Sequence, residues 1–221
     1  INMMNKRAKD LGAVNTHFVN TNGMHHEDHY TTARDMALIA QHAMTIPAFR
    51  NIVRKESFDM TPTNKHETWN TLYTTNKFLR NGTSSDCTFN VIGVKTGFTT
   101  PAGHNLVTAA TNENGMELIS VVLGVKTPRA WEDVYKYSEK LLQYGFDNYT
   151  IETLVNENAY IATINVSGAK DNPNLGLVTK QGISSVLPLV YSSENSDAHK
   201  SDTYNHDITS SSINYDRWGI I

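Results

Sequence analysis

One stretch of the chain has the sequence Val91-Ile92-Gly93-Val94-Lys95-Thr96-Gly97-Phe98-Thr99-Thr100-Pro101-Ala102-Gly103-His104-Asn105, an apolar run that ends in Lys-Thr-Gly. The apolar run predicts a β-strand, and the Gly-, Thr- and Pro-rich residues after it predict a turn. Lys95 and Thr96 point to opposite faces of a strand, but we expect Gly97 to let the backbone bend so that both polar groups reach one cleft. Gly97 also lacks a side chain that would block a peptide backbone from pairing with the strand. The segment therefore predicts one wall of a binding cleft.

The composition of the 221-residue chain is that of an ordinary globular protein, with 39% hydrophobic and 19% charged residues. A formal net charge of −3 provides no basic footprint, so we expect no nucleic-acid partner. No apolar run approaches the roughly 20 residues of a membrane span. Cys87 is the single cysteine and forms no disulfide within the chain, and its turn-forming neighbours disfavour it as a nucleophile.

Helical patterns precede the Lys-Thr-Gly segment. We expect a surface helix over residues 2–11, and a second helix that is N-capped by Thr31 or Thr32, with Asp35 close to the capping-box position. Residues 58–79 show no helical period, and we expect them to be extended. The buried stripe of the second helix is expected to contain Ala33, Met36, Ala37, Ile39, Ala40 and Ala43.

Three apolar runs predict an antiparallel meander: residues 91–94, 106–110 and 118–125, joined by short Gly- and Asn-rich turns. A helix over residues 131–144 follows, and we expect Gly145 to end it. A helix packed on such a sheet predicts an α+β fold. The side chains expected on the packed side of this helix are Val134, Tyr137, Leu141 and Leu142.

The composition and the pattern of apolar residues change after residue 146. Residues 147–221 contain short β-rich runs at 150–155, 159–166, 175–180 and 183–187, which are separated by Asn, Asp, Gly and Pro clusters. We therefore expect an α+β domain over residues 1–146 and a small all-β domain after it. From about residue 191 the chain is rich in Ser, Asn, Asp and His and fits neither pattern, so it is either a tail or further strands of that domain.

One loop resembles a metal site. His25-His26-Glu27-Asp28-His29 offers five ligand-type side chains in a row. Neighbouring residues on a loop rarely converge on one ion, whereas zinc ligands are usually spaced across a turn or knuckle. A solvated loop is the favoured interpretation, and we expect no metal and no cofactor.

The Lys-Thr-Gly segment lies within a longer match, which strongly resembles the D-alanyl-D-alanine carboxypeptidases of the low-molecular-mass penicillin-binding type. Their motif set is Ser-x-x-K, Ser-x-Asn and Lys-Thr-Gly. The resemblance covers about residues 1–146 and continues more weakly to about residue 190. The matching strings are Leu11-Gly12-Ala13, His17 to Met24, His29 to Ala37, Trp69-Asn70-Thr71, Thr75 to Leu79, Ala102 to Ala110, Leu118 to Gly124 and Leu141 to Phe146.

The resemblance implies a partial transpeptidase-like domain, related to β-lactamases, and a role for each motif residue. Lys95 is expected to supply positive potential near the nucleophile, and Thr96 to bind the terminal carboxylate of the substrate. Gly97 leaves room for the substrate, and the backbone N–H of Phe98 is expected to form half of an oxyanion hole. Arg129 is a second candidate for binding the carboxylate, although its spacing to the following helix departs from the family pattern and a solvated helix-start arginine fits equally well.

The family's Ser-x-x-K and Ser-x-Asn motifs precede Leu11-Gly12, and no such strings occur there. Ser167-Gly168-Ala169-Lys170, Ser193-Glu194-Asn195 and Ser212-Ile213-Asn214 come after Lys-Thr-Gly, which reverses the family order. The first of these strings also lies in a turn-forming run, whereas the motif requires Ser and Lys on one face of a helix. We therefore expect the chain to be the C-terminal part of a carboxypeptidase, without its nucleophile.

The implied function is trimming of peptidoglycan stem peptides that end in D-Ala-D-Ala, by a serine enzyme that β-lactams acylate. An extracytoplasmic location follows from the same resemblance. The sequence leaves two alternatives open. One is a non-catalytic cell-wall binding or scaffold relative, and the other is a class A β-lactamase, which the β-rich extension after residue 146 disfavours.

Because the nucleophile motifs are missing from these residues, we predict that the 221-residue chain alone releases no D-alanine and forms no adduct with fluorescent penicillin. Stoichiometric labelling by penicillin would contradict this. We also expect self-association of the chain through apolar surface that lacks an N-terminal partner, and light scattering that finds a strict monomer would count against it.

Overall fold

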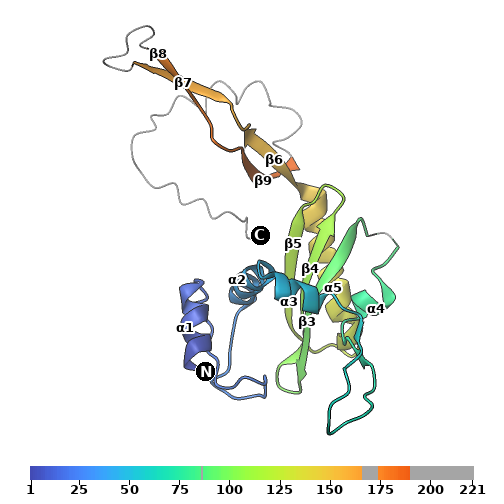
Figure 1. Cartoon of the computed structure of the whole chain (residues 1–221). Helices are drawn as coiled ribbons and strands as arrows, with labels where there is room; N and C mark the ends of the chain where they lie inside the picture. The colour runs from blue at the N-terminus through green and yellow to red at the C-terminus, as the bar shows by residue number, and fades with distance from the viewer. Residues whose placement is uncertain (86, 166–173, 190–221) are drawn as a thin grey trace. The chain divides into compact units, whose positions relative to one another are not determined.

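The computed structural model describes residues 1–85, 87–165 and 174–189, and the chain forms two compact units, Ile1–Phe146 and Asp147–Ile221. The first unit is built on three strands, β3 (Phe89–Thr99), β4 (Gly103–Asn112) and β5 (Glu117–Val125). They pair in the order β3-β4-β5, and both pairings are antiparallel (Figure 1). The predicted meander is therefore confirmed, and all three strands are longer than the apolar runs that predicted them.

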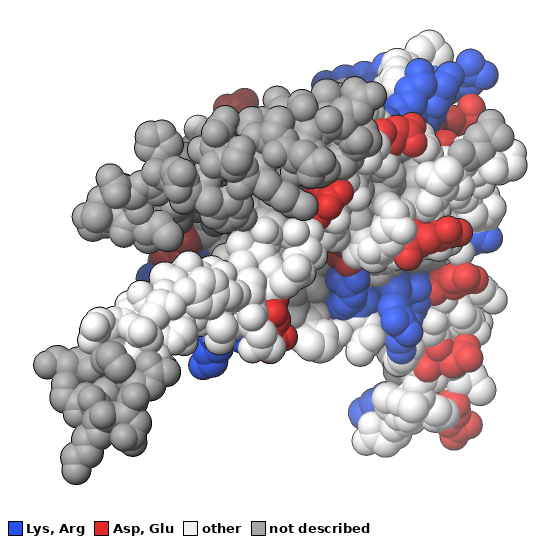
Figure 2. Space-filling view, turned by 90° about the horizontal axis from the view of Figure 1, so that it is seen from above, with Lys and Arg blue, Asp and Glu red and all other residues white. Residues whose placement is uncertain are grey.

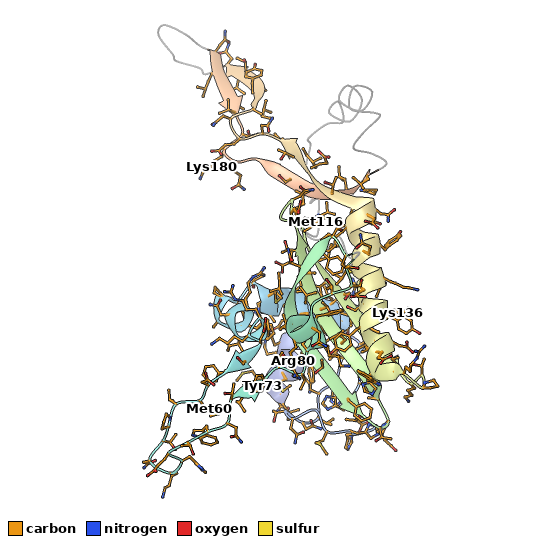
Figure 3. The ribbon with its side chains drawn as sticks, turned by 90° about the vertical axis from the view of Figure 1, so that its right-hand side faces the viewer. Met60, Tyr73, Arg80, Met116, Lys136 and Lys180 are labelled. Atoms are coloured by element: carbon orange, nitrogen blue, oxygen red, sulfur yellow. The ribbon has the colours of Figure 1, made fainter. Side chains whose placement is uncertain are left out.

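Helices cover both faces of this sheet. Figure 3 shows α5 (Ala130–Asn148) along one face, with α2 (Ala33–Met44) and α3 (Pro47–Val53) on the other side. The central strand β4 is buried at five consecutive residues, 106–110, because it has a strand on each side and helices above and below. This arrangement confirms the α+β class.

Two apolar clusters hold these layers together. Leu106 belongs to the first cluster and packs with side chains from α4 (Lys77–Asn81), β5 and α5, namely Phe78, Val122, Val125, Ala130 and Val134. Val107 and Ala109 belong to the second cluster, together with Ala40, Met44 and Val94. The successive residues Leu106 and Val107 thus pack in different clusters, while Val107 and Ala109 share one, as the two-residue period of a strand requires.

Helix α2 begins as predicted, but its buried side differs from the predicted stripe. Thr32 is the N-cap, and its side chain accepts a hydrogen bond from the backbone N–H of Asp35. The Asp35 carboxylate is fully buried and accepts bonds from Asn15 N–H and from the Thr16 hydroxyl, instead of completing a capping box. The buried residues of the helix are Asp35, Ala40 and Met44, whereas Ala33 is exposed.

Strand β3 has one irregularity, and it is not at Gly97. The register shifts between Val91 and Gly93, while pairing with β4 continues evenly through Gly97 to Thr99. The bend that we expected at Gly97 is therefore wrong. Gly93 has a packing role instead, since a Cβ atom there would lie 2.9 Å from the carbonyl oxygen of Val53 in α3.

Helix α5 continues past Gly145 to Asn148, so the expected stop at this glycine is wrong. Gly145 is buried where the helix crosses the sheet, and a Cβ atom there would lie 2.5 Å from Leu118. Val134 and Leu142 are buried as predicted, but Tyr137 and Leu141 are 40% and 51% exposed. The buried face instead includes Ser138, whose hydroxyl donates to Thr108 in β4.

The remaining elements of the first unit are short. Helix α1 (Asn2–Asp10) confirms the predicted first helix, and Gly12 follows it with a positive φ of 82°. Between α3 and β3 lie β1 (Ser57–Phe58), β2 (Leu72–Tyr73) and α4 (Lys77–Asn81). Helix α4 was not predicted, because five residues with a single buried apolar side chain, Phe78, show no helical period.

The second unit contains four described strands in two antiparallel pairs. Strand β6 (Tyr149–Val155) pairs with β9 (Ile183–Pro188), and β7 (Tyr160–Asn165) pairs with β8 (Asn174–Val178). These strands confirm the β-rich character predicted there, whereas residues 191–221 lie outside the described residues. In the described part of the chain, no helix combines the length and the apolar character of a membrane span.

The two glycines of β3 predict opposite responses to alanine. Gly93→Ala should destabilise the chain by about 1–3 kcal/mol, because the added methyl group meets backbone atoms of α3 that cannot move alone. Gly97→Ala should change stability by less than about 0.5 kcal/mol, since its new Cβ would meet nothing closer than Asn105 at 3.9 Å. Urea unfolding of both variants measures the difference, and equal losses would contradict the assignment of Gly93 to packing.

Candidate active site

The Lys-Thr-Gly residues lie in the second half of β3, at one edge of the three-stranded sheet. Within the described residues, β3 pairs with β4 on one side and with no other strand. Lys95 and Gly97 are exposed, and Thr96 is half-buried. An edge strand offers unpaired backbone groups beside these side chains, which suits the binding of an extended peptide.

A groove of about 680 Å³ runs beside this part of β3. Its walls come from three places: the end of α3 and the residues after it, the strands β1 and β2, and residues 74–76 before α4. Val94, Lys95 and Thr96 complete the lining. Both polar residues of the motif therefore face one groove, because the groove follows the strand edge and not because the backbone bends.

Figure 3 shows the segment that forms the outer wall. Tyr73 lies in β2 near the body of the unit, and Met60 lies farther out on the excursion that connects β1 with β2. Within residues 58–79 only Phe58, Leu72 and Tyr73 lie in strands, and α4 begins at Lys77, so the extended structure predicted there is found only in part. Phe58, Leu72 and Tyr73 are exposed apolar or aromatic side chains of this wall. They give the groove an apolar side opposite the polar motif.

Lys95 and Thr96 make different contacts within the groove. The Lys95 ammonium donates to the backbone carbonyl of Thr96 at 2.8 Å, so it is held close to its own strand. The Thr96 hydroxyl lies 2.5 Å from the hydroxyl of Thr75, which belongs to the facing wall. A cation and a hydroxyl group thus lie next to each other at an exposed edge, an arrangement that suits an anionic ligand.

Tyr135 of α5 supports the facing wall. Its hydroxyl accepts a hydrogen bond from Lys77 N–H at 3.1 Å and donates to the Thr75 carbonyl at 3.3 Å. Burial raises the pKa of the Tyr135 phenol above its ordinary value, while the bond from Lys77 N–H opposes the shift. The phenol therefore keeps its proton at neutral pH and can donate it to Thr75.

Gly97 and Phe98 continue the strand beyond the groove. The Asn105 amide donates to the carbonyls of Gly97 and Gly103, and its oxygen accepts from Gly124 N–H at 2.8 Å. This side chain ties the motif strand to the end of β5. The Phe98 side chain is 61% exposed, and its ring lies 4.5 Å from the His104 ring, centroid to centroid.

Arg129 is not one of the residues that line the groove. It is exposed, in the turn before α5, and its carbonyl accepts from the N–H groups of Glu132 and Asp133. Among the described residues that line the groove, Arg129 is not found. The structure therefore brings Lys95 and Thr96 together and leaves Arg129 outside the groove.

The other sequence candidates lie elsewhere. His26 and Asp28 come within 3.9 Å of each other on their loop, but no three described His, Cys, Asp or Glu side chains form a group that could hold a metal ion. Cys87 is half-buried, with its sulfur 3.2 Å from the Ser84 hydroxyl. The motif-like strings at residues 167–170, 193–195 and 212–214 lie outside the described residues. We expected none of the three to act in catalysis.

Charges of both signs share the surface. On the face seen in Figure 2, blue Lys and Arg side chains alternate with red Asp and Glu side chains. This mixture agrees with a formal net charge of −3 for the whole chain. Because the formal net charge of the chain is −3, we expect single cations such as Lys95, and not the net charge, to attract an anion.

The comparison with known proteins agrees with this arrangement. The family model of the D-alanyl-D-alanine carboxypeptidases matches residues 1–127 of the chain. The chain therefore belongs to the D-alanyl-D-alanine carboxypeptidase family, which is a family of serine hydrolases. The resemblance inferred from the sequence motifs is confirmed.

Two curated relatives illustrate the similarity. D-alanyl-D-alanine carboxypeptidase DacA of Haemophilus influenzae is 40% identical over 156 residues, which are 70% of this chain and 36% of the relative. DacC of Escherichia coli is 38% identical over 177 residues, which are 80% of this chain and 40% of the relative. The chain thus spans two fifths or less of the length of these relatives.

Solved structures confirm the fold. Penicillin binding protein 5 from Haemophilus influenzae has a TM-score of 0.64 and 33% identity, covering 85% of this chain and 50% of that one. The Streptomyces K15 DD-transpeptidase has a TM-score of 0.56 and 35% identity, and the match covers 66% of this chain and 53% of that one. The first unit therefore has part of the transpeptidase-like fold of penicillin-binding proteins.

The site contains residues that sequence reasoning did not single out. Thr75 and Asn105 lie in strings that matched the family, but no role was assigned to either. Tyr135 was missed entirely, because a tyrosine on an amphipathic helix carries no sign of the strand segment that it contacts. The role of Tyr135 is visible only in its contact with Thr75, which lies 60 residues away in the sequence.

Tyr135→Phe should destabilise the chain by about 1–3 kcal/mol, because Lys77 N–H and the Thr75 carbonyl each lose a partner in a partly buried place. Urea unfolding measures this loss. Tyr137→Phe is the matched control, since Tyr137 is an exposed tyrosine of the same helix. An equal effect of both substitutions would contradict a specific role for Tyr135.

Proposed function

We propose that this chain provides the substrate-binding strand of a serine-type D-Ala-D-Ala carboxypeptidase, which trims peptidoglycan stem peptides and is acylated by β-lactams. The observation that carries the proposal is the position of Lys95 and Thr96 in one groove at the open edge of β3. Members of the family are cell-wall enzymes, which supports a location outside the cytoplasm.

The proposed reaction has two steps, acylation of a serine and hydrolysis of the acyl-enzyme. A serine attacks the carbonyl of the penultimate D-alanine, terminal D-alanine leaves, and water then hydrolyses the acyl-enzyme. In our proposal the serine belongs to a Ser-x-x-K segment of the kind that the family carries. This chain supplies the surface against which the peptide is held while that bond is broken.

The terminal carboxylate of the substrate is the anion that the groove receives. The Lys95 ammonium attracts it, and the attraction strengthens when the bound peptide displaces water from the groove. The Thr96 hydroxyl donates a hydrogen bond to the same carboxylate. Lys95 leaves its contact with the Thr96 carbonyl at little cost, because an exposed ammonium exchanges partners readily.

The exposed edge of β3 serves the reacting part of the peptide. The substrate backbone lies along this edge, where Gly97 presents no side chain, as β-strand addition requires. The backbone N–H of Phe98 then supplies one donor of the oxyanion hole, and the N–H of the serine supplies the other. A backbone donor is compatible with any side chain at this position, including the exposed phenyl ring found here.

Lys95→Ala should reduce kcat much more than Arg129→Ala in the full-length product of the gene. Lys95 lies in the groove, and by analogy with charged and hydrogen-bonding groups of other active sites its loss should cost about 3 kcal/mol or more of transition-state stabilisation. Arg129 lies outside the lining and should mainly raise KM, with an effect that shrinks as salt is added.

The measurement is kcat and KM on a peptide that ends in D-Ala-D-Ala, at low and moderate ionic strength. Lys126→Ala serves as the control for loss of an exposed cation near the end of β5. Equal losses of kcat for Lys95→Ala and Arg129→Ala would place Arg129 in the catalytic group. A full-length wild-type protein that binds such peptides without cleaving them would favour the scaffold alternative.

A further inference from the structure

The closest polar contact of the motif is made by a residue outside it. The hydroxyl groups of Thr75 and Thr96 lie 2.5 Å apart, across 21 residues of sequence. Both residues line the same groove. Thr75 precedes α4 on the opposite wall and is not part of the Lys-Thr-Gly motif. The motif therefore assigns it no catalytic or binding role.

The direction of this hydrogen bond matters for binding an anion. A threonine hydroxyl has one proton, so Thr96 can donate either to Thr75 or to a ligand, but not fully to both. When Thr75 donates to Thr96, the Thr96 proton is free to point into the groove. A carboxylate in the groove favours this direction, and the chain of two hydroxyl groups polarises toward the anion.

Thr75 is held in place from behind. Its carbonyl accepts from the Tyr135 hydroxyl, and the adjacent Asn76 is buried and caps α4 by accepting from Phe78 N–H. The next residue, Lys77, places its ammonium 3.0 Å from the centroid of the Trp131 ring in α5. The Thr75 hydroxyl therefore projects from a backbone that helix α5 anchors, toward an exposed edge strand.

We propose that Thr75 is a positioning residue that donates its hydroxyl proton to Thr96 and so directs the Thr96 proton to the terminal carboxylate of the substrate. The inference rests on the proposed function, because the ligand is the carboxylate of a D-Ala-D-Ala peptide. Thr75 touches Thr96 and not the scissile bond. Its loss should therefore weaken substrate binding more than it slows the chemical steps.

The first test uses the full-length product of the gene and a peptide that ends in D-Ala-D-Ala. Thr75→Val keeps the shape and removes the hydroxyl, and it should raise KM about five- to tenfold while kcat changes less than about twofold. Thr75→Ser restores a hydroxyl and should stay within about twofold of wild type in KM. Thr71→Val is the matched control and should leave KM unchanged, because Thr71 donates to Asp59 and does not line the groove.

A double variant separates positioning from a general structural effect. Since Thr75 acts through Thr96, adding Thr75→Val to Thr96→Val should raise KM no further. An unchanged KM for Thr75→Val, an equal rise for Thr71→Val, or fully additive effects in the double variant would each overturn the proposal.

The second test needs no activity and uses the 221-residue chain. The shifts in urea midpoint caused by Thr75→Val and Thr96→Val should be non-additive. The double variant should be no less stable than the less stable of the two single variants. Additive midpoint shifts would show that the hydroxyl pair does not form, and would overturn the positioning role whatever the activity. An inactive full-length wild type with non-additive midpoints would instead overturn the proposed function, and the positioning role with it.

Discussion

Burial of strand β4 on both faces is the constraint on which the candidate site depends. Residues 106–110 are buried without a break, with Leu106 in the cluster that includes α5 residues and Val107 in the cluster that includes α2 residues. A strand with such surroundings has a single register, because a slip by one residue would exchange the two sets of side chains. Strand β3 inherits this register through its pairing, so the position of Lys95 opposite Val107 is set by the core.

The candidate site lies at the edge of the sheet, outside this buried core. The second half of β3 has a strand on one side and a groove on the other, and the polar groups there are held by a few specific contacts. Thr96 meets Thr75, Thr75 meets Tyr135, and Asn105 joins Gly97 to the end of β5. A rigid sheet thus carries the motif, while its ligand-facing side chains stay accessible, as a binding edge requires.

Prediction from sequence succeeded where periodicity and short motifs carry the signal. The meander, helices α1 and α2 and the family followed from apolar runs, the Thr32 cap and ordered motif strings. It failed where tertiary contacts decide the role of a residue. Gly97 and Gly145 were interpreted as a bend and a helix end, yet one lies in regular pairing and the other makes room for Leu118. The facing wall at Thr75 depends on contacts across many residues, for which no local pattern exists.

The central claim is that β3 from Val94 to Phe98, with the wall at Thr75, receives the end of a D-Ala-D-Ala peptide. The most direct measurement is NMR of the ¹⁵N-labelled 221-residue chain, titrated with such a peptide and with its D-Ala-D-Ala amide as a control without the carboxylate. We expect saturable backbone amide shifts concentrated at Lys95, Thr96, Gly97 and Thr75, and much weaker shifts with the peptide amide that lacks the carboxylate. Shifts concentrated in the second unit or the His25–His29 loop, or equal shifts with both peptides, would contradict it.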